Sequence, residues 1–150
     1  MQIKLLELTE EIREQCLGLK VSAEQAQYIS SVEDSLRAAA DEADVARPFA
    51  ICADGKIVGF TVFAFDEAYE DPNDRYWLWK YMIDETQQGK GYGTAALREV
   101  IRYFKEHGAV NIRLSTKETN TSALSMYRKA GFRETGEMND EEIVLQLDWE

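Results

Sequence analysis

The seven residues from Gln88 to Thr94, Gln-Gly-Lys-Gly-Tyr-Gly-Thr, form the pattern with the clearest chemical meaning in this 150-residue chain. Three alternate glycines lie between an apolar stretch typical of a strand and an amphipathic stretch typical of a helix. Glycines let the backbone approach a ligand closely, and the first N–H groups of a helix point outward without intrahelical partners. The pattern therefore predicts an anion-binding loop, with phosphate as the expected occupant.

Two well-known phosphate-binding loops do not match this segment. A Walker loop requires Gly-x-x-x-x-Gly-Lys followed by Ser or Thr, and Lys90 has neither that spacing nor a hydroxyl residue after it. The dinucleotide-binding fingerprint requires Gly-x-Gly-x-x-Gly, whereas Gly89, Gly91 and Gly93 alternate and stand late in the chain. On these glycines alone, a turn that only ends a strand stays open as an alternative.

A second motif spans Asn120 to Phe132 and reads Asn-Thr-Ser-Ala-Leu-Ser-Met-Tyr-Arg-Lys-Ala-Gly-Phe. Together with Gln88-x-x-Gly91-x-Gly93, which ends 27 residues before Asn120, it resembles the GNAT superfamily of N-acetyltransferases. The resemblance covers nearly the whole chain. It implies one N-acetyltransferase domain over residues 1–150. The expected fold is α/β (α+β), with a mixed, mostly antiparallel central sheet of about seven strands and about four flanking helices.

The resemblance implies that acetyl-CoA (acetyl coenzyme A) is the acetyl donor. Its pyrophosphate would lie on the backbone N–H groups of the glycine loop, with Lys90 adding positive charge, and its pantetheine arm would follow the main chain of Met82 to Asp84. Tyr127 occupies the position where the family keeps the acid that protonates the departing thiolate; a core tyrosine is the alternative. The implied cofactor-binding residues are Met82, Ile83, Asp84, Gln88, Gly89, Lys90, Gly91, Tyr92, Gly93, Thr94, Asn120, Ala123 and Tyr127.

The segment from Val21 to Ala39 resembles the bacterial spermine/spermidine acetyltransferases, in which this region forms one wall of the acceptor pocket. Tyr28, Glu33 and Asp34 are therefore candidates to hold a cationic amine; the alternative is a core tyrosine beside solvated carboxylates. Trp79 stands where polyamine-type relatives often carry a carboxylate, and its π face could bind a cation with about 1 kcal/mol. The general base stays unassigned among Glu33, Asp34 and the acidic segment described next.

The composition is acidic, with a formal net charge of −11. Such a surface repels nucleic acid and favours a cationic partner, although acidity for solubility is an equal alternative. Five carboxylates gather in a segment that we call the acidic loop, where they could steer a polycation or simply face water. They are Asp66, Glu67, Glu70, Asp71 and Asp74.

Cys16 and Cys52 lie in apolar patterns and are interpreted as reduced core thiols. Together with the lack of a recognisable signal peptide or membrane span, this interpretation predicts a cytoplasmic protein. His107, the single histidine, stands at the end of a predicted helix and is interpreted as a favourable charge there. A homodimer formed through Trp149 and the final strand is a further option.

Hydrophobic periodicity and turn residues predict the order of the elements. The expected series begins with a strand from Ile3 to Thr9, a helix capped by Thr9 and a broken helical segment from Ser22 to Ala43 with Ser22 and Ser31 as caps. A hairpin from Pro48 to Phe65 follows, with its turn at Asp54-Gly55, and then a strand from Tyr76 to Asp84 that is buried on both faces. The last elements are a helix ending near Gly108, a strand from Val110 to Leu114, a helix starting at Asn120 or Thr121, and a final hairpin that turns at Asn139-Asp140.

The predicted function is acetyl-CoA-dependent acetylation of a small-molecule primary amine such as spermine or spermidine. Two alternatives stay open. The acceptor could be an aminoglycoside, an amino acid or a protein amine, or the chain could be a coenzyme A-binding sensor without turnover.

Overall fold

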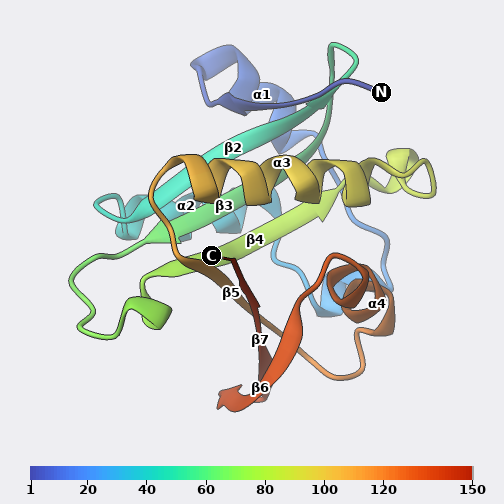
Figure 1. Cartoon of the computed structure of the whole chain (residues 1–150). Coiled ribbons are helices and arrows are strands. Elements are labelled where there is room, and N and C mark those ends of the chain that lie inside the picture. The colour runs from blue at the N-terminus through green and yellow to red at the C-terminus, as the bar shows by residue number, and fades with distance from the viewer. Residues whose placement is uncertain (150) are drawn as a thin grey trace.

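The computed structural model describes residues 1–149, which form a seven-stranded sheet in the order β1-β2-β3-β4-β5-β7-β6, with helices on both faces (Figure 1). The strands are β1 Ile3–Glu7, β2 Ala46–Ala53, β3 Lys56–Phe65, β4 Tyr76–Ile83, β5 Asn111–Thr116, β6 Arg133–Asn139 and β7 Glu142–Asp148. The helices are α1 Glu10–Leu17, α2 Val32–Asp41, α3 Tyr92–Glu106 and α4 Thr121–Lys129, with short 3₁₀ turns η1 Gln25–Gln27, η2 Pro72–Asp74 and η3 Glu85–Gln87. The predicted mixed, mostly antiparallel sheet is confirmed.

The sheet is nearly divided at the junction between β4 and β5. These strands run parallel and share a single register pair, Trp77 with Arg113, whereas every other neighbouring pair is antiparallel and longer. Beyond that pair the two strands diverge, as Figure 1 shows. The facing edges of β4 and β5 therefore hold backbone N–H and C=O groups that need another partner.

Trp79 is an extra residue in β4, and because of it the alternation of side chains between the two faces of the sheet is reversed after this position. Phe63 of β3 pairs with Leu78 and Val62 pairs with Lys80, so Trp79 has no partner across the ladder. Before this bulge Leu78 packs with α3; after it Met82 packs with α1 and α2 on the other face.

The prediction that β4 is buried on both faces is therefore wrong in its middle. Trp79 is 36% exposed. Tyr76 is buried before the bulge and Tyr81 packs against the core after it, whereas Trp79 is exposed at the cleft that begins where the strand leaves β5.

Local sequence signals account for several element boundaries. The Thr9 hydroxyl accepts the Ile12 N–H (3.2 Å) and the Ser31 hydroxyl accepts the Asp34 N–H (3.1 Å), as the capping predictions require. The predicted Asp54-Gly55 turn is confirmed, with φ of 49° and 86°.

Several boundaries differ from the prediction by one to two residues; β1, for example, ends at Glu7 and β2 begins at Ala46. The final hairpin turns at residues 140–141, because Asp140 takes the left-handed φ of 54°. The strand β5 begins at Asn111, leaving Val110 49% exposed before it.

Both cysteines are buried and unpaired, as predicted. Burial raises the pKa of the Cys16 thiol to about 11, so this sulfur stays protonated near neutral pH. The Trp149 indole donates to the Ala109 carbonyl (3.1 Å) and lies under the Lys105 ammonium, so this side chain has partners within its own chain. No helix among the described residues has the length and apolar character needed to cross a membrane.

The Asp84 carboxylate joins the end of β4 to two neighbouring loops. It accepts the N–H of Lys20 (2.8 Å), the N–H of Thr86 (3.1 Å) and the Thr86 hydroxyl. Burial acts to raise the pKa of this carboxyl, but the hydrogen bonds from Thr86 and Lys20 outweigh it, so the pKa of Asp84 is lowered. Folding therefore favours the ionised form.

We expect Asp84→Asn to lower the free energy of unfolding by about 1 kcal/mol at neutral pH. Since the pKa is lowered in the folded state, this contribution is present above the usual carboxyl pKa of about 4 and is lost as the pH falls through the lowered value. Urea unfolding at pH 7 and at successively lower pH measures the difference. Glu85→Gln, an exposed neighbour, is the control, and a difference that stays constant over that range would contradict the prediction.

Candidate functional site

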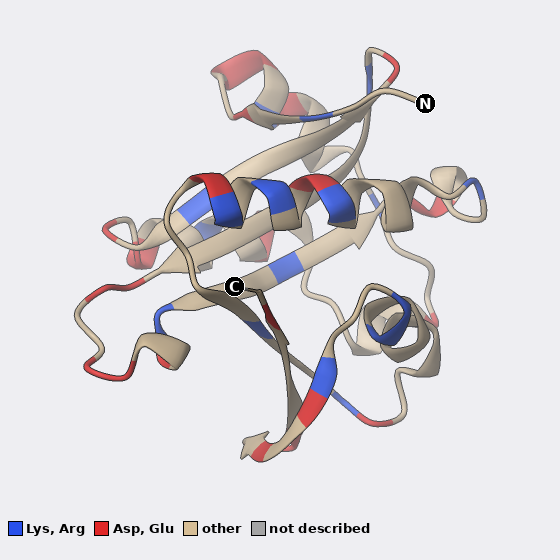
Figure 2. Cartoon of the chain, in the orientation of Figure 1, with Lys and Arg blue, Asp and Glu red and all other residues tan. Residues whose placement is uncertain are grey.

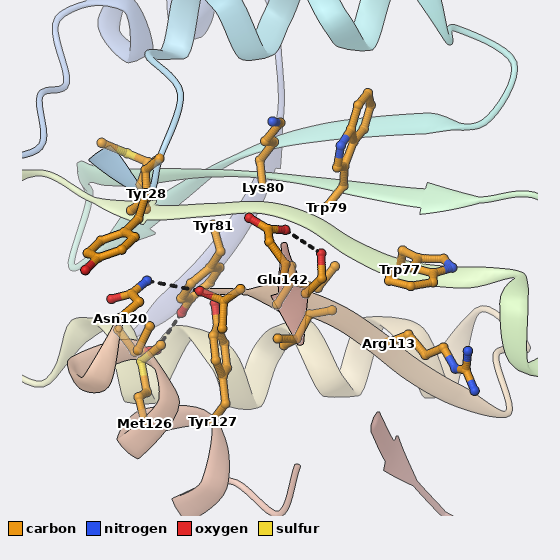
Figure 3. Close-up of a pocket in the computed structure, with 18 of the residues that line it drawn as sticks. Tyr28, Trp77, Trp79, Lys80, Tyr81, Arg113, Asn120, Met126, Tyr127 and Glu142 are labelled. Carbon is orange, nitrogen blue, oxygen red and sulfur yellow. Dashed lines mark hydrogen bonds between the residues drawn. The ribbon is translucent and has the colours of Figure 1, made fainter. Parts of the chain in front are cut away.

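A cleft of about 970 Å³ runs through the split between β4 and β5 (Figure 3). Its walls come from the glycine loop, the start of α4, the η1 region, β4, β5 and the final hairpin. The structure brings most of the predicted site residues to this cleft: Tyr28, Trp79, Met82, Ile83, Gln88, Gly89, Gly91, Tyr92, Gly93, Thr94, Asn120, Ala123 and Tyr127.

The glycine loop forms one end of the cleft and has the shape expected of an anion cradle. Gly89 and Gly91 take left-handed φ values of 78° and 85°, which are accessible to glycine at little cost. The first helical hydrogen bond of α3 joins the Ala95 N–H to the Gly91 carbonyl (3.1 Å). The three N–H groups of residues 92–94 therefore precede the helical ladder and stay available to an anion.

Two side chains hold this loop against β4. The Tyr81 hydroxyl donates to the Gly93 carbonyl in the first turn of α3, and the Gln88 amide donates to the Ile83 carbonyl (3.0 Å). Burial, and secondarily the nearby Tyr127, raises the pKa of Tyr81 well above its ordinary value, so this hydroxyl remains a donor. Tyr81 was not singled out from the sequence, because nothing in a run of aromatic residues tells which one reaches a backbone carbonyl of the next helix.

Tyr127 lies inside the cleft on α4 and is 8% exposed. Among the described residues its hydroxyl has no hydrogen-bond partner, and its ring packs edge to face on Phe132 (5.7 Å). Burial raises the pKa of Tyr127 far above that of free tyrosine, so the hydroxyl keeps its proton near neutral pH and can act as a donor. The Phe132 N–H bonds the Tyr127 carbonyl (3.0 Å) across Gly131, whose φ is 106°. This helix end explains the Gly-Phe pair of the second motif.

Asn120 stands directly before α4 and donates from its amide to the Thr116 hydroxyl (3.2 Å) at the end of β5. It lines the cleft together with Ala123 and Tyr127, so the predicted common face of this helix is present. The hydrogen bond fixes the Asn120 amide in the connection between β5 and α4.

The wall opposite α4 combines aromatic side chains with one cation. The Tyr28 hydroxyl donates to the Thr119 hydroxyl (3.0 Å), and the Lys80 ammonium donates to the Ser30 hydroxyl (3.4 Å). Lys80 also lies 5.4 Å from the centre of the Trp79 ring. The π face of Trp79 that was predicted to bind a cationic ligand therefore already has a protein cation beside it.

Four predicted site residues do not reach the cleft. Glu33 and Asp34 pair instead with Arg37 (3.3 and 3.4 Å) on the outer face of α2, where their side chains are 73% and 64% exposed. The helical period directs Val32 and Leu36 inward and these acids outward, so the structure does not bring Glu33 and Asp34 to the cleft where they were predicted to hold an amine.

Asp84 and Lys90 are also displaced from their predicted positions. The Asp84 N–H bonds the Val58 carbonyl (2.8 Å) and its carboxylate caps η3. Lys90 is exposed on the outside of the loop and donates to the Gln87 side chain (3.2 Å). Neither lines the cleft.

The cleft has an excess of negative charge on its acceptor side. Two of its carboxylates, Asp74 and Glu137, pair with the buried Arg113 guanidinium (3.0 and 2.8 Å). Figure 2 shows that the loop carrying Asp66 and Asp74 projects beside the start of β4. The charged residues of the cleft are five acids and two bases: Glu42, Asp66, Asp74, Glu137, Glu142, Lys80 and Arg113.

Of this set, only the acidic loop was considered from the sequence. Three further charged residues come from different strands: Arg113 from β5, Glu137 from β6 and Glu142 from β7. They meet at the cleft only because β7 lies between β5 and β6 in the sheet. The alternation of side chains along β5 and β7 shows which face of the sheet each residue occupies, but it does not show which residues of the neighbouring strands lie beside it.

Comparison with known proteins agrees with this geometry. The model of the Acetyltransferase (GNAT) family matches residues 6–132. The chain is 32% identical over 151 residues to the spermine/spermidine N(1)-acetyltransferase of Bacillus subtilis strain 168, covering 97% of this chain and 99% of that protein.

Solved structures give the same fold. The PaiA N-acetyltransferase of Thermoplasma acidophilum in complex with coenzyme A superimposes with a TM-score of 0.70 at 17% identity, over 99% of this chain and all of that one. An aminoglycoside acetyltransferase in complex with coenzyme A gives 0.74 at 18% identity, over 98% and 95% of the two chains.

We expect Gly91→Val to weaken binding of coenzyme A about tenfold or more. A β-branched residue at a φ of 85° costs about 1–2 kcal/mol, and the backbone would relax by moving the N–H groups of the cradle. Calorimetric titration with coenzyme A measures the effect. Gly55→Val, with nearly the same φ of 86° in a hairpin turn outside the cleft, is the matched control; an equal loss of affinity in both variants would contradict the assignment.

Proposed function

The chain belongs to the Acetyltransferase (GNAT) family and uses acetyl coenzyme A as its acetyl donor, and we propose that it acetylates a primary amine of a polyamine such as spermine or spermidine. The observation that carries the proposal is the charge of the cleft. Glu42, Asp66 and Glu142 line it without an ion-pair partner among residues 1–149. A ligand with several ammonium groups can neutralise such a set, whereas a monovalent amine pairs with only one of these carboxylates.

The residues present fit the donor. The N–H groups of residues 92–94 suit a pyrophosphate, and the edges of β4 and β5 beyond Trp77 offer backbone partners to an extended amide-containing chain. We propose that the donor is held by Met82, Ile83, Gln88, Gly89, Gly91, Tyr92, Gly93, Thr94, Asn120 and Ala123. When bound, coenzyme A supplies an acetyl thioester, which is the electrophile of the reaction.

We propose that Tyr127 protonates the sulfur of the leaving group. A departing thiolate, with a reference pKa of about 8.5, requires a proton donor within hydrogen-bond reach. Tyr127 fits because its hydroxyl is protonated, has no partner among residues 1–149 and projects from α4 into the cleft. We further propose that the protein acts in the cytoplasm, which its two unpaired cysteines support.

One observation favours a second acceptor class. Lys80 places an ammonium group in the wall that also contains Tyr28 and Ser30. A cation at this place suits an acceptor that carries a carboxylate as well as an amine, such as a diamino acid.

A panel of acceptors separates these proposals. We expect kcat/KM for spermine and spermidine to exceed that for diamino acids by about tenfold or more, because polyamines match several unpaired carboxylates without adding a negative charge. Aminoglycosides, which are also polycations without a carboxylate, are included in the panel because the charge of the cleft does not separate them from polyamines. Coenzyme A release near pH 8, corrected for the two protein thiols, gives the rates. A preference for diamino acids would replace the first proposal by the second.

We expect Tyr127→Phe to lower kcat at least about tenfold and to leave the affinity for acetyl coenzyme A within about twofold, because the lost hydroxyl acts only when sulfur departs. Steady-state kinetics and calorimetric titration measure the two quantities. Tyr76→Phe, a buried tyrosine outside the cleft, is the control. A Tyr127→Phe enzyme as fast as the wild type would remove the hydroxyl from the mechanism.

A further inference from the structure

Glu142 is the first residue of β7, and its side chain reaches from that strand into the cleft, toward β4 in Figure 3. One carboxylate oxygen accepts a hydrogen bond from the Ser115 hydroxyl on β5 (2.7 Å). This single contact orients the group and leaves the second oxygen unoccupied by any described residue. Glu142 is half-buried, so the carboxylate is shielded from bulk water without being sealed off.

The placement follows from the register of the two strands. Ser115 pairs with Val144 and Arg113 pairs with Gln146, so alternate residues of β5 and β7 share the face that borders the cleft. Glu142 is the next residue on this face of β7 after Val144, and it is the first residue of the strand after the hairpin turn. From there its side chain reaches Ser115.

The other carboxylates of the cleft are engaged or lie at its edge. Asp74 and Glu137 are neutralised by Arg113. Asp66 accepts the N–H of Ala68 (3.1 Å) within its own loop, and Glu42 follows the end of α2. Among the acids of the cleft, Glu142 is therefore the one that accepts a side-chain hydroxyl, has no ion-pair partner among residues 1–149 and belongs to a strand of the split sheet.

We infer that Glu142 is the proton acceptor for the attacking amine, oriented by Ser115. The inference rests on the proposed function only in requiring an amine acceptor; it does not depend on which amine is used. Tyr127 and Glu142 then act at opposite ends of the reaction, one giving a proton to sulfur and the other taking a proton from nitrogen.

The step balances as follows. A primary ammonium, with a reference pKa of about 10, first loses one proton to solvent. The nitrogen lone pair forms the C–N bond to the acetyl carbon, and Glu142 takes a second proton from this nitrogen. The C–S bond breaks with its electron pair on sulfur, which takes the Tyr127 proton. The proton on Glu142 returns to the Tyr127 phenolate through solvent, so one proton is released for each amide formed.

The test compares Glu142→Gln with Glu141→Gln, which removes the same charge from the neighbouring exposed position outside the cleft. Glutamine still accepts the Ser115 hydrogen bond but takes no proton. We expect kcat of Glu142→Gln to fall about 100-fold, with Tm and the calorimetric Kd for acetyl coenzyme A unchanged and a weaker Kd for the acceptor in the presence of coenzyme A. Ser115→Ala is expected to lower kcat severalfold, since the carboxylate loses its orientation.

Two results would overturn the inference. One is a Glu142→Gln enzyme with kcat within about threefold of the wild type. The other is an acceptor KM that rises while kcat is unchanged, because Glu142 would then only bind the ammonium ion. If the wild type does not acetylate spermine or spermidine, the polyamine proposal fails, and the same kcat ratio is measured with the fastest amine of the panel. The two failures are therefore distinguishable.

Discussion

The pairing of β4 and β5 at one position is the constraint on which the site depends. Parallel strands that separate after Trp77 and Arg113 leave N–H and C=O groups without ladder partners, which is costly unless a ligand or water replaces them. The split therefore creates both a space and an unmet hydrogen-bonding requirement in the middle of the sheet. The glycine loop follows β4 after the short turn η3, and α4 follows β5, so the anion cradle and Tyr127 both lie at this opening.

Arg113 holds the closed end of that split. Its guanidinium is buried, with 9% of the side chain exposed, and it bonds Asp74 of η2, Glu137 of β6 and Gln146 of β7. A buried guanidinium is tolerated only when its N–H donors are paired, so the burial of Arg113 depends on these three contacts. They fix the acidic loop against the final hairpin and leave the remaining cleft carboxylates to a ligand.

The bulge at Trp79 determines what the acceptor side contains. Without the extra residue, Leu78 and Lys80 would project to the same face of the sheet; with it, the strand presents Leu78 to α3 and Met82 to α1 and α2. The bulge also leaves Trp79 partly exposed at the cleft, with Lys80 beside it. One inserted residue therefore turns the two halves of β4 toward opposite layers of the molecule.

The sequence by itself determined the order of the elements, the glycine cradle and the common helical face of Asn120 and Tyr127, because these follow from local rules of capping, turn conformation and helical period; the role of Tyr127 came from the family resemblance. The hairpin at Asp54-Gly55 and the Gly131-Phe132 helix end were predicted for the same reason. Only the tertiary structure decided that Glu33 and Asp34 face solvent, that Arg113 neutralises two cleft acids and that Glu142 reaches the space beside β4. These outcomes depend on a bulge, on strand order and on contacts between residues far apart in the chain, none of which has a local signature.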